Sequence, residues 1–188
     1  IKYAGGTSDL MYKIAKAQSE SGKNVEIWTG DHMVDLDLVD RSPFRVKIFK
    51  SFLDKIGLSI MPMLPFYALF KLEKDDIIHF HVIRTYQNLI LFLIARVKGI
   101  KYVIDAHGAV PIHAEKKILK LFFDFLIGNS FIKNANSIIA ESSVGVDEYL
   151  EAYNFLDKKN IDILSPPFDI SEYKDLEKKY NFNFRNKF

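Results

Sequence analysis

The sequence predicts an α/β protein in which a Rossmann-like parallel sheet carries helices on both faces. Two observations support this prediction. Short runs of branched apolar residues alternate along the chain with longer segments whose apolar residues recur at helical spacing. In addition, 48% of the 188 residues are apolar and 27% are charged, a balance that suits one packed domain and excludes a disordered chain.

The first helix is expected directly after a glycine pair. Thr7 or Ser8 can cap it with a hydroxyl, Asp9 places negative charge in the first turn, and Gly22 ends it. In this fold a strand normally precedes such a glycine turn. Only residues 1–3 could belong to that strand, so we expect the first strand to be truncated.

The other elements follow from the same two patterns. Strands are predicted at 25–29, 44–49, 77–82, 102–106, 137–140 and 161–164, and helices at 85–97, 115–134 and 143–152. The acidic segment 30–42 has the composition of a loop, and 50–74, which two prolines interrupt, has no clear pattern. Strands that alternate with helices form parallel sheets, which bind ligands at the carboxyl ends of their strands.

The expected organisation is one domain over residues 1–170 and a polar, lysine-rich segment at 171–188 that acts as an interdomain linker or an edge helix. The chain has no cysteine, which excludes disulfides and thiolate metal sites. The net charge is only +2, and we expect no nucleic-acid partner. The longest uncharged run, 56–70, is shorter than the roughly 20 residues of a membrane-spanning helix.

A phosphate site is one interpretation of the glycine pair Gly5-Gly6. A helix N-terminus offers free N–H groups to an anion, and glycine lets the backbone approach a phosphate closely. The alternative is a plain tight turn, because the full Gly-x-Gly-x-x-Gly pattern is absent. The sequence also lacks the glycine-lysine loop of P-loop nucleotide-binding proteins, and that class is excluded.

Polar residues at predicted strand ends are the other candidates. His107 follows the strand 102–106, where an imidazole can donate a hydrogen bond or move a proton. His79 and His81 share one face of a strand, but two ligands are too few for a metal site and no nearby carboxylate completes a known spacing. Ser142 either caps the next helix or contacts a substrate at the same rim.

Residues 41–74 combine seven basic side chains with two acidic ones and many large apolar residues. Such a segment can rest on an anionic membrane surface, and we expect that contact through residues 44–70. The alternative is that the apolar residues belong to the core and the lysines are solvated. The expected location is cytoplasmic, with a peripheral position on the inner face of the membrane.

Three stretches resemble the N-terminal half of the GT-B glycosyltransferases of family four, also called group one. They are 5–29, then 76–81 with 99–108, and finally 135–142 with 163–169. Their order and spacing cover nearly the whole chain. The sequence departs from the family pattern at Lys23-Asn24, where Gly-His is usual, and at Pro167-Phe168, where Asn-Gly is usual.

The resemblance implies the acceptor-binding domain of a retaining, hexosyltransferase-like enzyme. Such an enzyme moves a sugar from a nucleotide sugar to a glycan or lipid-linked acceptor, with no cofactor and no essential metal. By position, the Gly5-Gly6 turn would face the donor diphosphate and His107 would lie beside the transferring sugar, in a catalytic role. Ser142 and His81 would lie at the acceptor side of the rim.

The same resemblance implies that a C-terminal donor-binding domain is absent from this chain, and that the chain alone is inactive. Two other interpretations stay open. One is a non-catalytic module of the same fold that binds an anionic ligand, and the other is a nucleotide-sugar epimerase of the GT-B type. A pair of glutamates in the donor-binding domain would distinguish transfer from both.

Overall fold

The computed structural model describes the chain over residues 6–54, 59–110 and 124–166. The helices in these ranges are α1 (Gly6–Glu20), α2 (Leu36–Asp40), α3 (Leu64–Lys71), α4 (Tyr86–Lys98), α6 (Asn129–Lys133) and α7 (Ser143–Ala152), with a π-helical turn η2 (Asp124–Gly128) and a 3-10 turn η3 (Lys158–Asn160). The strands are β1 (Glu26–Gly30), β2 (Arg45–Phe49), β3 (Ile77–His81), β4 (Lys101–Asp105), β5 (Ser137–Ala140) and β6 (Ile161–Ile163).

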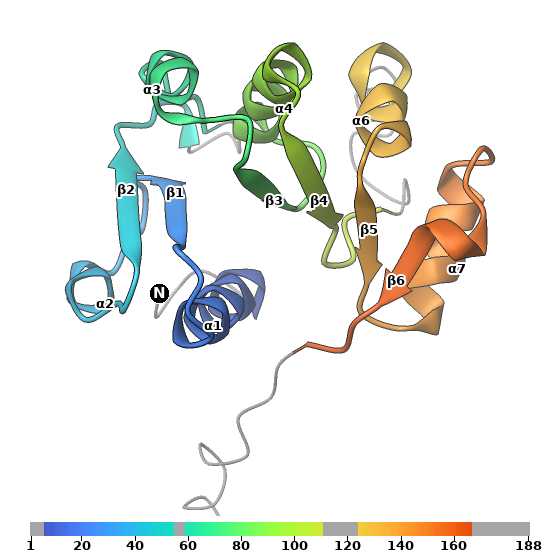
Figure 1. Ribbon diagram of the computed structural model, residues 1–188, viewed down its shortest axis with the longest axis horizontal. Coiled ribbons are helices and arrows are strands. Elements are labelled where there is room, and N and C mark those ends of the chain that lie inside the picture. The colour runs from blue at the N-terminus through green and yellow to red at the C-terminus, as the bar shows by residue number, and fades with distance from the viewer. Residues whose placement is uncertain (1–5, 55–58, 111–123, 167–188) are drawn as a thin grey trace, which may run out of the picture.

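Every pair of neighbouring strands is parallel, which confirms the predicted α/β class. The strands form two sheets, β1-β2 and β3-β4-β5-β6, where the sequence suggested one. In the described part of the chain β1 pairs only with β2, and β3 pairs only with β4. No described strand therefore joins the two sheets. Figure 1 shows α3, α4 and α6 along one side of the molecule and α1 and α2 along the other.

Local capping explains where the longer helices begin and end. The Thr85 hydroxyl accepts the backbone N–H of Asn88 at the start of α4, and Gly99 ends that helix in the left-handed conformation at φ 68°. The cap expected for α1 is wrong, because that helix already begins at Gly6 and therefore contains Thr7 and Ser8.

Two short helices lie in segments for which the sequence predicted none. The side chain of Asp35 accepts the backbone N–H of Leu38, and this cap starts α2 within the expected acidic loop. Pro65 lies in the first turn of α3, where a missing N–H leaves no helical hydrogen bond unmade. The proline that obscured the pattern of 50–74 is therefore compatible with a helix. Residues 111–123, which hold the first half of the predicted helix 115–134, lie outside the described residues, as does the segment 171–188.

One part of the core lies between the four-stranded sheet and the helices α4 and α6, and buried residues of α3 and α7 belong to the same core. Phe80 of β3, Tyr102 of β4, Phe92 of α4 and Phe131 of α6 form one cluster of aromatic rings, with centroids 4.9 to 5.8 Å apart. The Tyr102 hydroxyl donates to the Phe131 carbonyl at 2.7 Å, so this buried phenol keeps a partner. Because side chains alternate along a strand, the residues beside Phe80 face the opposite side of the sheet.

A buried ion pair ties together the segments that follow β3 and β4. The Arg84 guanidinium contacts the Asp124 carboxylate at 2.6 Å, and both side chains are almost buried, at 12% and 9% exposure. The same guanidinium donates to the Ala109 carbonyl at 2.7 Å. One side chain thus holds the loop after β3, the loop after β4 and the start of η2 in fixed positions.

We expect Arg84→Met to lower the free energy of unfolding by about 3–5 kcal/mol, because it leaves Asp124 buried without its partner. Urea unfolding measures this change. The matched control is Lys159→Met, which removes an exposed pair with Asp157 and should change stability very little. Equal stability of the two variants would show that the Arg84 pair does not hold these loops.

Candidate functional site

The register of the four-stranded sheet brings three strand ends to one place. His81, the last residue of β3, pairs with Asp105, the last residue of β4, and Asp105 pairs with Ile139 of β5. The residues that follow these strands, among them His107 and Glu141, therefore lie at the same rim of the sheet. This is the edge at which parallel α/β sheets bind ligands.

His107 is at the centre of this rim. Its Nδ1 atom lies 2.6 Å from Oε1 of Glu141 and 3.3 Å from Oδ1 of Asp105. Its Nε2 atom lies 2.7 Å from Nδ1 of His81, and the two imidazole rings stack at a centroid distance of 5.0 Å. The His107 side chain is only 3% exposed, and both of its ring nitrogens have protein partners.

Two local features direct His107 and His81 to each other. His107 adopts a φ of 47° and Gly108 a φ of 72°, a left-handed turn that few residues other than glycine accept. After β3, the buried amide of Asn88 donates to the carbonyls of His81 and Val82 at 3.1 and 3.0 Å. These bonds hold the end of β3 against the start of α4.

The hydrogen bonds assign the protons of the two rings. Burial lowers the pKa of His81 to about 3, so this ring is neutral at physiological pH. The short contact between His107 Nδ1 and Glu141 places a proton on Nδ1, because an ionised carboxylate only accepts. In neutral His107 the Nε2 atom is then the acceptor for Nδ1–H of His81.

Asp105 and Tyr149 are the buried polar groups beside His107. Burial raises the pKa of Asp105, and the neighbouring His107 opposes that rise. Burial also raises the pKa of Tyr149, so its hydroxyl stays protonated. Carboxylates thus lie on one side of the His107 ring, next to Nδ1.

A cavity of about 190 Å³ opens beside this cluster. Strand ends β4 and β5 and the first turns of α7 form its wall, which includes Asp105, His107, Gly108, Glu141, Ser142, Gly145, Glu148 and Tyr149. The wall therefore combines an imidazole, carboxylates and hydroxyls, the groups that bind and orient hydroxylated ligands.

The structure brings together some of the predicted site residues. His107 and His81 are in direct contact, and Ser142 lines the same cavity. Ser142 also caps α7, with its hydroxyl accepting the Gly145 N–H at 3.3 Å, so the capping interpretation is confirmed. Gly6 is the first residue of α1 and is not part of the cavity wall, and Gly5 lies outside the described residues.

Comparison with known families gives one assignment. The model of Glycosyltransferase Family 4 matches residues 4–172. The chain belongs to this family. A search of the curated proteins finds no match.

Family membership makes this chain a transferase domain, with a nucleotide sugar and an acceptor as the general classes of substrate. The predicted resemblance of the strand-end motifs and the glycine pair to glycosyltransferase family four is therefore confirmed for the family. The role expected for the Gly5-Gly6 turn toward the donor diphosphate stays a prediction.

Sequence reasoning about this glycosyltransferase domain missed Asp105 and Glu141. Glu141 follows β5 directly, just as His107 follows β4, so its position after a predicted strand was a usable signal. The contact of Glu141 with His107 could not be predicted from the sequence, because the two residues are 34 positions apart. No sequence pattern indicated a role for Arg84, because this residue lies in a loop.

Among the described residues, two overlapping groups of side chains have ligand atoms close enough to share a metal ion. They are His79, His81 and Asp105, and Asp105, His107 and Glu141, with all ligand atoms of a group within 4.8 Å of one another. The sequence analysis found no third ligand for the pair His79 and His81. In the structure a neighbouring strand provides one, Asp105. The expectation that transfer needs no metal stays a prediction.

We expect Glu141→Ala to shift the proton of His107 from Nδ1 toward Nε2, because it removes the nearer carboxylate acceptor. Two-dimensional ¹⁵N–¹H correlation spectra of the imidazole rings measure which nitrogen is protonated. The control is Glu148→Ala, which removes a carboxylate from the same cavity but not from His107. If the His107 spectrum is the same in both variants, Glu141 does not set the tautomer.

Proposed function

We propose that this domain forms the acceptor side of a retaining glycosyltransferase that moves a hexose from a nucleotide sugar to a glycan or lipid-linked acceptor. The observation that supports the proposal is the contact of the buried His107 side chain with Glu141 at the wall of a polar cavity, at the carboxyl ends of parallel strands. Such a rim is where this class of fold places its reacting groups.

The chemistry proposed for His107 follows from its partners. Glu141 and Asp105 lie beside Nδ1 and stabilise an imidazolium form of the ring. In that form Nε2 carries a proton and would donate a hydrogen bond to a substrate oxygen in the cavity, in place of the bond that Nε2 accepts from His81. A preorganised donor of this kind stabilises charge that develops on oxygen during transfer.

The remaining roles follow from position. The acceptor would occupy the cavity next to Ser142 and Glu148, whose polar atoms suit hydroxyl groups. The donor site would be completed by a second domain, and transfer would need neither a metal nor another cofactor. His107 would therefore act through hydrogen bonding and charge.

We expect His107→Ala to lower kcat about 100-fold in the protein that contains this domain, the usual effect of losing one preorganised donor. The assay follows nucleotide release from a nucleotide sugar in the presence of acceptor. His32→Ala is the control, because His32 is exposed in the turn after β1 and should leave kcat unchanged. Unchanged turnover of the His107 variant would remove this residue from the mechanism.

We also propose that the domain contacts an anionic membrane surface through part of the segment 44–70. The expectation for the whole segment needs correction, since Phe44, Phe49, Met61 and Leu64 are buried in the core. The exposed apolar residues of this segment include one side of α3 and the residue just before that helix. Met63, Phe66 and Phe70 recur at helical spacing and are 63%, 59% and 90% exposed.

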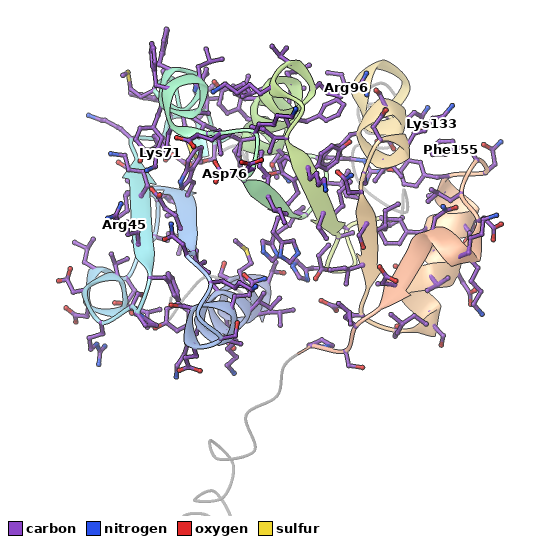
Figure 2. The ribbon with its side chains drawn as sticks, in the orientation of Figure 1. Arg45, Lys71, Asp76, Arg96, Lys133 and Phe155 are labelled. Carbon is purple, nitrogen blue, oxygen red and sulfur yellow. The ribbon has the colours of Figure 1, made fainter. Side chains whose placement is uncertain are left out.

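The exposure of this side of α3 supports the contact. Lys71 at the end of the helix and Lys74 beyond it are exposed, and so are the acidic residues Glu73, Asp75 and Asp76 of the same stretch. Figure 2 shows side chains projecting from α3 and α4 on the side away from the strands. Within the described ranges no helix has the length and hydropathy to span a bilayer, so the proposed contact is peripheral.

We expect the double variant Phe66→Ser/Phe70→Ser to bind vesicles that contain anionic lipid several-fold more weakly than the unchanged protein. Binding should also fall with salt, because the Debye length shortens to ~8 Å at 0.15 M. Co-sedimentation with the vesicles measures both effects. Leu36→Ser, which removes an exposed leucine on α2, is the control. Equal binding to neutral and anionic vesicles would contradict the role of the lysines.

A further inference from the structure

A histidine pair on β3 faces a carboxylate on the neighbouring strand. His79 and His81 are two residues apart, so their rings lie on the same face of the strand, with centroids 4.2 Å apart. Asp105 of β4 is paired with His81 in the parallel register and therefore lies on that face too. One ligand atom from each of the three residues lies within 4.8 Å of the other two.

Two atoms of this group have no hydrogen-bond partner among the described residues. They are Nε2 of His79 and Oδ1 of Asp105, and both are buried. Asp105 as a whole is only 4% exposed, and its Oδ1 lies 3.3 Å from His107 Nδ1 without forming a hydrogen bond. A buried carboxylate oxygen and a buried ring nitrogen without partners are unfavourable unless a third group binds both.

The hydrogen bond of His81 to His107 uses only one of the two ring nitrogens of His81. Its Nδ1 faces His107 Nε2 at 2.7 Å, and His107 Nδ1 faces Glu141 at 2.6 Å. A proton on Nδ1 of His81 leaves the lone pair on Nε2. Histidines that bind metals are oriented in this way, with the second ring nitrogen donating to a neighbouring group.

The residue types agree with this geometry. Imidazole nitrogen and carboxylate oxygen are ligand atoms that divalent transition metals accept. Both histidines are partly accessible, which gives an ion a route to the group.

We propose that His79, His81 and Asp105 form a binding site for one divalent transition-metal ion such as Zn²⁺. Nitrogen and oxygen ligands from two imidazoles and one carboxylate are a ligand set that zinc accepts in a tetrahedral site, with the fourth position left to water. The group Asp105, His107 and Glu141 is less suitable, because Nδ1 of His107 is already hydrogen-bonded to Glu141.

This site does not depend on the proposed sugar transfer. A bound ion would fix the ring of His81 and, through it, the position of His107 Nε2. Asp105 also lines the cavity, so a bound ion would act on the rim through Asp105 and His81. It gives the His-x-His pair of β3 a role that family membership does not assign.

The test is direct titration of the chelator-treated protein with Co²⁺ and Zn²⁺. The d–d absorption of Co²⁺ reports four-coordinate geometry, and calorimetry gives the Kd for Zn²⁺. We expect one ion per chain, with a Kd at least about tenfold weaker in His79→Ala and in Asp105→Asn. His32→Ala, an exposed histidine, is the matched control and should bind as the unchanged protein does.

The outcomes separate clearly. The proposal is overturned if no ion binds, or if His79→Ala binds Zn²⁺ as tightly as the His32→Ala control. If Asp105→Asn does not fold, by circular dichroism, the comparison of the two histidine variants decides alone. Transfer assayed with and without chelator is a separate readout, because sugar transfer that survives removal of the ion supports the proposed function and leaves the binding result unaffected.

Discussion

The in-register parallel pairing of β3, β4 and β5 is the constraint on which the site depends. β3 and β4 start and stop together, and β5 ends one residue beyond the partner of Asp105, so the residues that follow the three strands meet at one edge. Aromatic packing of Phe80 and Tyr102 against α4 and α6 fixes the other face of the sheet. A shift of one residue in either pairing would turn Asp105 or His81 into this aromatic layer.

Three carboxylates lie at or after the segments that form the rim. Asp105 and Asp124 are buried, and the side chain of Glu141 is 33% exposed. Arg84 neutralises Asp124 directly, and His107 lies between the other two. The loops that carry His107 are thus held both by an ion pair and by hydrogen bonds, which is the rigidity that a preorganised donor requires.

Some apolar side chains of the segment 44–70 are buried and others are exposed. The core takes up the inner residues of the segment 44–70, while one side of α3 keeps its large apolar groups exposed. Lys98 of α4 donates to the carbonyls of Leu69 and Leu72 at the end of α3 and so holds that helix in place. The exposed side is therefore a fixed surface and not a loosely attached segment.

The sequence by itself determined the class of the fold, the family and the positions of most strands, because hydrophobic periodicity and capping are local properties. Thr85, Gly99 and Ser142 mark helix boundaries through bonds to residues at most four positions away. His107 was predictable for the same reason, since a polar residue after a strand marks the binding rim. The short helices α2 and α3 were missed, because a cap at Asp35 and a proline in the first turn of α3 do not stand out from loop composition.

Only the tertiary structure decided which of these residues meet. The contact of His107 with Glu141, the ion pair of Arg84 with Asp124 and the approach of Asp105 to His79 join segments between 26 and 40 residues apart. Such contacts depend on strand order and register, which follow from the packing of the whole sheet and not from any local pattern. The His-x-His pair was visible in the sequence, but its third ligand came from the neighbouring strand.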